Sequence, residues 1–116
     1  MDASATHVGG QVGDAAELKA IGRRFAELDY KPSIGSTKSL TGHALGAAGV
    51  CEAIYSLIMV NNDFLAESAN LKSPVEEAAD MNMLTARKDG EVNRVMSNSF
   101  GFGGTNCCLV FDRYTE

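Results

Sequence analysis

The spacing of apolar residues in the first third of the chain predicts one amphipathic helix. Residues 1–13 are small, polar and glycine-rich, show no period, and are predicted to form a loop. Asp14 is predicted to begin the helix, because Asp14 and Glu17 have the spacing of a capping box. One apolar face follows at helical spacing, formed by Leu18, Ile21, Phe25 and Leu28. The helix is expected to end at residues 30–32, because a proline disfavours helical geometry in the residue before it.

The segment 44–60 carries the strongest apolar signal in the chain. Its first half is alanine and glycine, and its second half is large and apolar, with Glu52 the one charged residue. The segment is long enough for about four to five helical turns. Because apolar residues fall on nearly every side, we predict a helix that is buried all round. Two glycines in its first turns imply that another backbone passes close to them, since glycine otherwise weakens a helix.

The rest of the chain predicts strands and loops. Two strands stand out, at residues 94–99 and 107–113, because they are apolar and rich in β-formers. Weaker strands are predicted at 33–36, 64–69 and 83–86, with a polar loop at 36–42, turns at 61–63 and 87–90, and a loop with a helical turn at 71–79. The order of one helix, a strand, a buried helix and several strands is an α/β layered pattern.

Composition narrows the classes of function. The 116 residues suit one domain, and the net charge of −5, without a basic run, excludes the usual nucleic-acid binder. The apolar segment 44–60 is interrupted by Glu52 and too short to span a bilayer, so no membrane partner is expected. The three cysteines form neither a disulfide framework nor a metal-ligand spacing. We expect reduced thiols, a cytoplasmic protein, and no metal or cofactor.

The residues just before the apolar segment form a candidate site. His43 is predicted to stand at the helix N-terminus, where the positive end of the helix dipole opposes protonation. A neutral imidazole there can donate a hydrogen bond to a developing oxyanion or thioester carbonyl. Lys38 adds a positive charge nearby, and Glu52 is a natural partner for a buried lysine. The alternative is that His43 is a polar cap residue and Lys38 is solvated.

A glycine-rich stretch between the two best strands forms a second candidate. Glycines at 101, 103 and 104 stand beside Phe100 and Phe102, which suggests a tight turn that brings the backbone near a ligand. A strand follows rather than a helix, so no helix N-terminus is available for a cofactor phosphate. The alternative is an ordinary hairpin loop. None of the cysteines at 51, 107 and 108 is nominated as a nucleophile, because none has a base nearby in the sequence.

Taken together, three stretches resemble the C-terminal region of β-ketoacyl-ACP synthases, the condensing enzymes of fatty-acid or polyketide synthesis. They are Ser-Thr-Lys-Ser-Leu-Thr-Gly-His-Ala-Leu-Gly-Ala-Ala-Gly at 36–49, Glu-Ala-Ile-Tyr-Ser-Leu at 52–57, and Met-Ser-Asn-Ser-Phe-Gly-Phe-Gly-Gly-Thr-Asn at 96–106. The resemblance covers about Val12 to Phe111. It implies α/β architecture, namely the C-terminal half of a thiolase-like fold, with a mixed sheet and a buried central helix that packs against its counterpart in the other half.

The resemblance also implies roles for individual residues. His43 matches the second active-site histidine of the family, a hydrogen-bond donor during decarboxylation and condensation. Lys38 matches the active-site lysine and Glu52 its partner. Phe102 matches the phenylalanine that gates the acyl pocket. The loop that carries this phenylalanine is matched by Phe100 and by the glycines at 101, 103 and 104, namely Gly101, Gly103 and Gly104.

The sequence departs from the family pattern at its N-terminal end. The nucleophilic cysteine belongs to the family's N-terminal half, which is not among these 116 residues. Counting back from residues 12–14, the first active-site histidine of the family falls on Thr6, with His7 one place away. Residues 8–10 replace the threonines that would hold the pantetheine arm. An apolar strand should precede this site, and residues 1–5 are a poor substitute, so we expect that strand to be missing.

Two interpretations of function follow. In the first, the chain is a truncated 3-oxoacyl-ACP synthase, by family an acyltransferase that condenses acyl thioesters with malonyl-ACP, and is inactive alone. In the second, it is a non-catalytic, self-associating fragment or interaction module. Segment 44–60 would expose a large apolar patch without its partner, so a homodimer or a missing N-terminal half is expected to cover it. We divide the chain into an atypical segment, 1–13, and a half-domain, 14–116.

Overall fold

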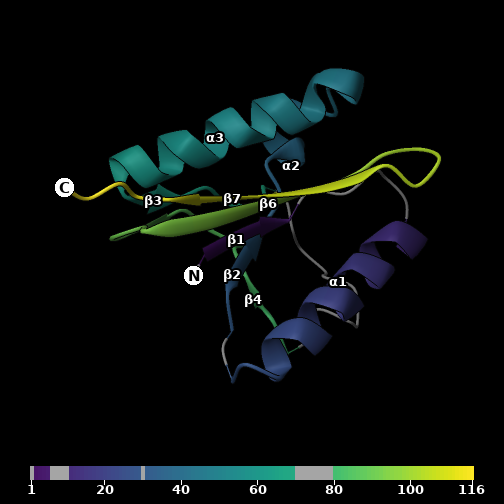
Figure 1. Ribbon diagram of the computed structural model, residues 1–116, viewed down its shortest axis with the longest axis horizontal. Helices are drawn as coiled ribbons and strands as arrows, with labels where there is room; N and C mark the ends of the chain where they lie inside the picture. Colours follow the sequence, from purple (N-terminus) through teal and green to yellow (C-terminus); the bar gives the residue numbers. More distant parts are fainter. Residues whose placement is uncertain (1, 6–10, 30, 70–79) are drawn as a thin grey trace.

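A five-stranded mixed sheet forms the centre of the molecule in the computed structural model, which describes residues 2–5, 11–29, 31–69 and 80–116 (Figure 1). The strand order is β4-β2-β1-β6-β7, with neighbours parallel except for the β6–β7 hairpin. The strands are β1 (Asp2–Ala5), β2 (Ser33–Gly35), β4 (Asn82–Met83), β6 (Arg94–Phe100) and β7 (Asn106–Asp112). The predicted α/β class and mixed sheet are confirmed.

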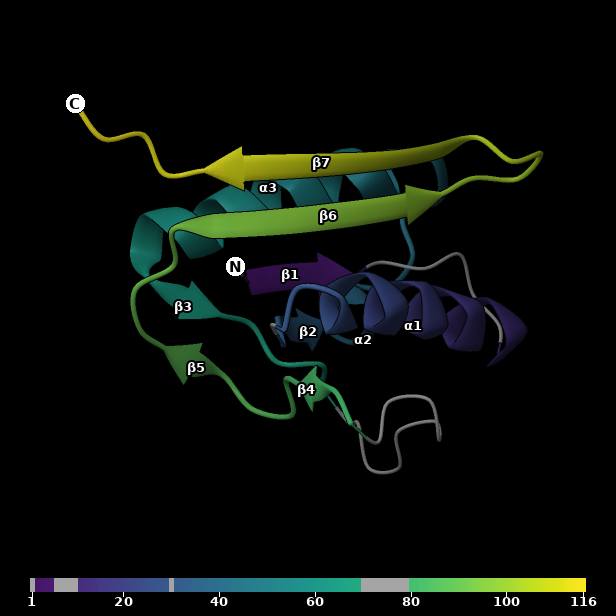
Figure 2. The same cartoon turned by 60° about the horizontal axis from the view of Figure 1, so that its bottom comes forward.

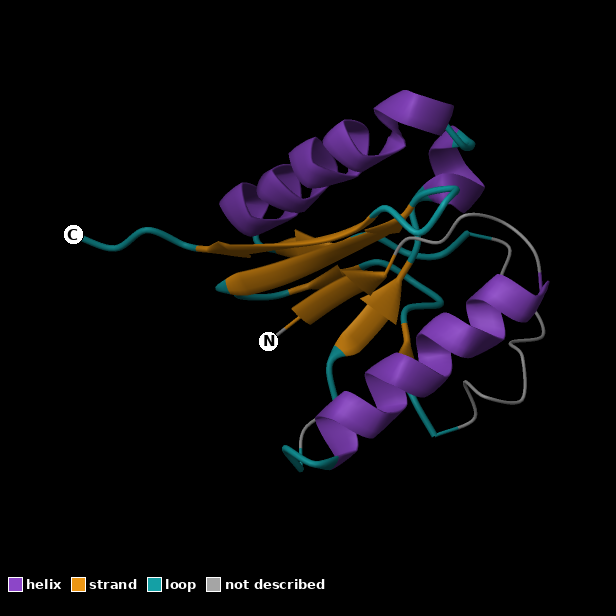
Figure 3. Ribbon diagram, turned by 45° about the vertical axis from the view of Figure 1, so that its right-hand side comes forward, coloured by secondary structure: helices purple, strands orange, loops and turns teal. Residues whose placement is uncertain are grey.

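Two helices cover the opposite faces of this sheet, as Figure 3 shows. On one face lies α1 (Gln11–Ala26). Its buried side chains Leu18, Ile21 and Phe25 pack with Ile34 of β2. This is the apolar face that the helical spacing predicts, except that Leu28 lies beyond the helix and is 53% exposed.

The second core lies on the other face of the sheet, under α3 (Ala48–Asn62). Met59 and Val60 of this helix pack with Val95 of β6 and with Leu65 of β3 (Phe64–Leu65). Successive residues of β6 point to opposite faces, so Val95 belongs to this core whereas Met96 packs against the α1 core. The longest parallel strand therefore joins the two layers.

The C-terminal end of α3 is closed by side chains from elsewhere in the chain. Asp63 follows the helix in the left-handed conformation, with φ 53°, and its carboxylate accepts a hydrogen bond from the Val92 amide at 3.1 Å. The Arg113 guanidinium donates to the Val60 carbonyl and to the Asp63 carboxylate. Arg113 thus satisfies a carbonyl that the helix leaves without an internal partner. A small sheet beside it pairs β3 with β5 (Lys88–Asp89).

Several boundaries differ from those that the sequence predicts. Residues 2–5, expected to be loop in place of a missing strand, form β1 at the centre of the sheet. Helix α1 begins at Gln11, so Asp14 lies within the first turn instead of capping it. The expected polar loop contains a short helix, α2 (Lys38–Thr41). Backbone pairing in a sheet supplies hydrogen bonds that weak local propensity does not reveal.

Other elements are shorter or displaced. The expected strand at 64–69 is limited to β3, and the one at 83–86 lies one residue earlier, as β4. Pairing with β3 turns part of the predicted turn at 87–90 into β5. The expected loop with a helical turn at 71–79 lies outside the described residues.

Helix α3 is apolar all round but is not buried all round. Its outward face is exposed, with Val50 at 67%, Ile54 at 50% and Ile58 at 45%. A short 3-10 turn, η1 (Leu45–Ala47), precedes the helix, so segment 44–60 is not one continuous α-helix. Among the described residues, only one of the two early glycines meets another segment. A Cβ on Gly49 would lie 3.3 Å from Ser99 Oγ, whereas a Cβ on Gly46 would have no neighbour within 4 Å. Within the described residues, no helix is both long and apolar enough to cross a membrane.

We expect the packing of β6 between the two layers to dominate stability. Val95 is 1% exposed, so Val95→Ala should lower the free energy of unfolding by about 2 kcal/mol, through lost burial and an unfilled cavity. Val110, on the paired strand β7, is 53% exposed, so Val110→Ala should change it by less than about 0.5 kcal/mol. Urea unfolding measures both variants. Equal losses would show that the core does not lie where the structure places it.

Candidate functional site

The predicted site residues gather at one end of the sheet. The arrowheads of β1 and β6 point to this end, where Figures 1 and 2 also show the β6–β7 turn and the beginning of α3. The close approach of Gly49 to Ser99 ties the first turn of α3 to the end of β6. The carboxyl ends of parallel strands are where open α/β sheets place their ligand sites.

A buried ion pair lies at the centre of this region. Lys38, the first residue of α2, donates through Nζ to Oε1 of Glu52 in α3. The side chains are only 13% and 5% exposed, respectively. The predicted pairing is therefore confirmed, and the alternative of a solvated Lys38 is wrong. Each charge is kept out of water by the protein and neutralised by the other, which fixes α2 against α3.

His43 is held by the main chain rather than by another side chain. Its Nδ1 accepts a hydrogen bond from the Leu45 amide at 2.9 Å. An accepting Nδ1 carries no proton, so the neutral ring has its proton on Nε2 and presents a donor there. The imidazole is exposed and open to a substrate from outside the chain.

The reason for this geometry differs from the one that the sequence suggests. Helix α3 begins only at Ala48, so His43 stands ahead of η1 and not at the α-helix N-terminus. A helix dipole acts mainly within the first turn, so it contributes less at this distance. The amide of Leu45 takes its place, and Leu45 adopts φ 52°, a left-handed conformation that costs a branched residue about 1–2 kcal/mol. Such strain often accompanies functional geometry.

The glycine-rich stretch is the turn of the β6–β7 hairpin. The Gly101 amide donates to the Thr105 carbonyl at 2.7 Å and closes the turn. Gly103 and Gly104 have φ values of 80° and 83°, which only glycine adopts without strain. Phe102 at the tip is 91% exposed, whereas Phe100 at the end of β6 is half-buried. The turn therefore holds an aromatic ring in solvent, where it is free to meet another surface.

The cysteines lie away from this end or lack the features of a nucleophile. Cys51 is partly buried in α3, while Cys107 and Cys108 are both exposed on β7. Cys107 pairs across the hairpin with Ser99 and Cys108 with Asn98, so the two point to opposite faces of the sheet, and both are exposed. Burial, and secondarily the neighbouring Cys107, raise the pKa of Cys108, which lowers its thiolate fraction.

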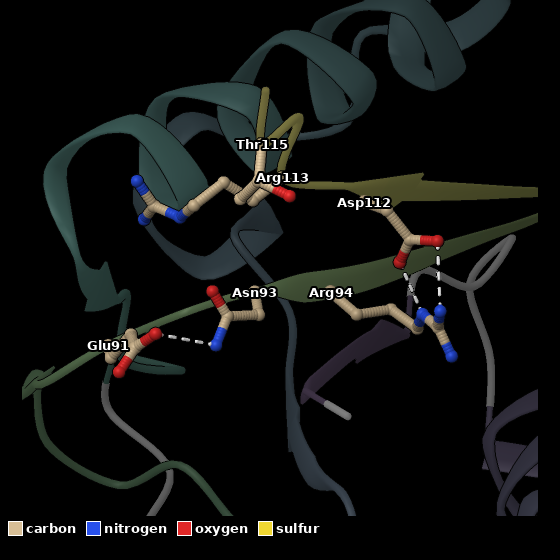
Figure 4. Close-up of a pocket in the computed structure, with 6 residues that line it drawn as sticks. All are labelled: Glu91, Asn93, Arg94, Asp112, Arg113 and Thr115. Carbon is tan, nitrogen blue, oxygen red and sulfur yellow. Dashed lines mark hydrogen bonds and ion pairs between the residues drawn. The ribbon is translucent and has the colours of Figure 1, made fainter.

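A pocket lies at the opposite end of β6 and is lined mainly by polar and charged side chains. Figure 4 shows Arg94 facing Asp112, with Nη2 donating to Oδ2 at 2.9 Å. The hydrogen bond from Arg94 lowers the pKa of Asp112. Arg113 extends from the same pocket toward α3. Arg94 pairs with Asp112, Asn93 donates to Glu91, and Arg113 holds the C-terminal end of α3, so these side chains serve as structural contacts. Nowhere in the described residues do three metal-ligating side chains gather.

Comparison with known proteins identifies the family of this chain. A sequence model of the family described as "Beta-ketoacyl synthase, C-terminal domain" matches residues 3–72, which include Lys38, His43 and Glu52. The chain belongs to this family. It is 54% identical over 105 residues to 3-oxoacyl-[acyl-carrier-protein] synthase 1 of Escherichia coli (strain K12), covering 90% of this chain and 25% of that protein. With synthase 2 of Coxiella burnetii it shares 41% identity over 101 residues, which is 86% of this chain and 24% of the relative.

Solved structures of the family have the same fold. The ketosynthase from module 6 of the bacillaene synthase of Bacillus subtilis 168 aligns with a TM-score of 0.89 at 31% identity, over 99% of this chain and 23% of that one. A β-ketoacyl synthase from Burkholderia phymatum STM815 aligns at 0.87 and 32%, over 99% and 28% of the two chains. The predicted resemblance to the C-terminal part of a thiolase-like ketosynthase is confirmed. The chain spans about a quarter of the length of the curated relatives it matches.

The structure leaves part of the expected pattern without a description. The first histidine and the pantetheine-binding threonines of the family would fall on Thr6 or His7 and on residues 8–10. These positions lie outside the described residues.

The structure adds a feature that sequence reasoning missed, namely a buried serine at position 68 that accepts a hydrogen bond from the Ser36 amide at 2.9 Å. No motif contains Ser68, and a separation of 32 residues hides the contact from local patterns.

Removing one member of the buried ion pair should be costly. Lys38→Met leaves the Glu52 carboxylate in a nearly water-free position, so we expect a loss of about 3 kcal/mol in the free energy of unfolding. Arg24→Met is the matched control, because the Arg24–Glu27 pair is 68% and 72% exposed and should change stability by less than about 1 kcal/mol. Chemical denaturation of both variants gives the comparison. Similar small losses would mean that Glu52 reaches water.

Proposed function

We propose that this chain supplies the His43, Lys38 and Glu52 part of a 3-oxoacyl-ACP synthase active site. The reaction is the decarboxylative Claisen condensation of an acyl thioester with malonyl-ACP, in fatty-acid biosynthesis. The observation that carries the proposal is the buried Lys38–Glu52 pair, whose lysine lies five residues before His43, a histidine with a free Nε2 donor. The names of the curated relatives support the same reaction and point to acyl carrier protein as the partner.

In this proposal the three residues have separate tasks. His43 donates from Nε2 to the thioester carbonyl of the malonyl group, which takes up negative charge as carbon dioxide leaves and an enolate forms. The enolate carbon then attacks the acyl thioester and the thiolate departs. Lys38, held by Glu52, supplies positive charge near the developing anion.

In the same proposal Phe102, exposed on its glycine turn, gates the acyl pocket. Phe100, Gly103 and Gly104 set the geometry of that turn.

The nucleophile must come from residues beyond these 116. Among the described residues no hydrogen bond joins a cysteine to a base, and the pKa of the exposed Cys108 is raised, not lowered. We propose that a portion carrying the family's nucleophilic cysteine covers the outward face of α3 and completes the site. The division into residues 1–13 and 14–116 stays a prediction, although β1 shows that residues 2–5 join the sheet.

The same exposed face supports a second candidate, a self-associating module without catalysis. Val50, Ile54, Leu57 and Ile58 line one side of α3 and leave a continuous apolar strip uncovered. Two copies related by a two-fold axis can bury this strip against itself. We therefore propose a homodimer for the chain by itself. We also propose a cytoplasmic location, because the free cysteines suit a reducing compartment.

A condensation assay tests the catalytic proposal. We expect the 116-residue chain alone to give no 3-oxoacyl product, and addition of a portion carrying the cysteine to give turnover. In that assembly His43→Ala should lower kcat by about 10²–10³-fold, because one oxyanion donor is lost. Arg24→Met, on the exposed face of α1, is the control and should keep full activity. Turnover by the pure chain would overturn the proposal.

Light scattering over a dilution series tests self-association. We expect a dimer at micromolar concentration, and Leu57→Glu should convert it to a monomer by placing a charge in the apolar strip. Leu28→Glu is the matched control, because Leu28 is a similarly exposed leucine beyond the end of α1, at 53% against 43% for Leu57. A monomer at all concentrations in the unmodified chain would contradict the homodimer.

A further inference from the structure

A buried serine far from every motif anchors the segment that leads to Lys38. Ser68 is 8% exposed, and its Oγ accepts a hydrogen bond from the Ser36 amide at 2.9 Å. Its own amide donates to the Leu84 carbonyl at 2.8 Å, and the Leu84 amide donates to the Ile34 carbonyl at 2.7 Å. Leu84 therefore links the backbone of Ser68 to that of Ile34 in β2.

The surroundings leave little room for this segment to shift. A Cβ on Gly35, the last residue of β2, would lie 3.2 Å from Leu84 Cδ1 and 3.4 Å from the Ala66 carbonyl oxygen. Ala66 and Leu84 therefore pack closely against the end of β2, just before Ser36. A small residue at position 35 lets these backbones approach closely enough for the hydroxyl of Ser68 to reach the Ser36 amide.

The anchored residue also touches the start of α2. The Lys38 amide donates a hydrogen bond to Ser36 Oγ at 3.4 Å, where the helix begins. Thr37 between them is buried, and its carbonyl accepts from the Leu40 amide at 2.9 Å and the Thr41 amide at 3.0 Å. The position of Ser36 therefore sets the origin of a four-residue helix whose first side chain is the buried lysine.

From these contacts we infer that Ser68 is a positioning residue for the Lys38–Glu52 pair. Without its hydroxyl, the half-buried Ser36 amide loses its acceptor, and the start of α2 is free to move. Lys38 Nζ then no longer meets Glu52 in a single geometry. The inference rests on the proposed function only for its effect on turnover, because the tether itself belongs to the 116-residue chain.

The test uses one matched control and two supporting variants. Ser68→Ala removes the acceptor. Ser33→Ala is the control, because Ser33 is also buried and accepts a side-chain hydrogen bond, from Asn82 Nδ2 at 3.0 Å, but at the other end of β2. Ser68→Thr keeps a hydroxyl and should rescue. Ser68→Cys has a side chain close to serine in size, but its sulfur is only a weak hydrogen-bond acceptor. It replaces Ser68→Ala if that variant does not fold.

Two measurements on the chain by itself decide whether the tether exists. In Ser68→Ala, hydrogen exchange of the Ser36 amide should rise at least about tenfold, and the nuclear Overhauser contacts between the Lys38 and Glu52 side chains should weaken. In Ser33→Ala and Ser68→Thr both should stay as in the unmodified chain. Unchanged exchange and contacts in Ser68→Ala and Ser68→Cys would overturn the inference, whatever the chain catalyses.

A third measurement uses the chain assembled with the cysteine-bearing portion. Ser68→Ala should lower kcat about tenfold with KM changed less than about twofold, because a displaced lysine weakens the reacting geometry more than substrate binding. Full kcat in Ser68→Ala together with a lost tether would overturn the positioning role. If the unmodified assembly does not condense, the proposed function fails, and the two measurements above still decide the tether.

Discussion

A carboxylate buried in the side of an otherwise apolar helix is the constraint on which this site depends. Glu52 stands on the inward face of α3, where it has almost no contact with water, and only a cation held close makes that position tolerable. Lys38 supplies the cation, so α2 must begin at a fixed place under α3. The position of His43 depends on α2 as well, because only Gly42 separates His43 from the end of that helix.

The sequence predicts best those elements whose stability is local or whose pattern has one clear period. The β6–β7 hairpin and the buried face of α1 belong to this group, since residues that favour strands and helical spacing are visible in them directly. Strand β1 does not, because Asp-Ala-Ser-Ala has no branched or aromatic residue and takes its form from two flanking strands, β2 and β6. The Ser68–Ser36 contact is hidden for a related reason, since it exists only once two distant segments have been brought together.

Helix α3 shows a different limit of sequence reasoning. Its residues are apolar on every side, which predicts a helix covered on all sides, but among the described residues only the inward face is covered. A pattern records the environment for which a segment is suited and does not say which polypeptide supplies it. The same argument holds for Phe102, whose ring stands in solvent on a turn built to hold it there. Both features leave apolar side chains exposed to solvent.

The hydrogen bond from the Leu45 amide to His43 has a consequence for how the site tolerates change. The donor is a main-chain group, so replacing the leucine side chain by almost any other leaves the donor in place. Proline alone removes it, because proline has no amide hydrogen and cannot adopt a positive φ. Glycine keeps the donor and adopts the left-handed conformation without steric cost. The proton on the imidazole is thus assigned by backbone shape, and a substitution at position 45 changes the tautomer only if it shifts the left-handed backbone that presents the amide.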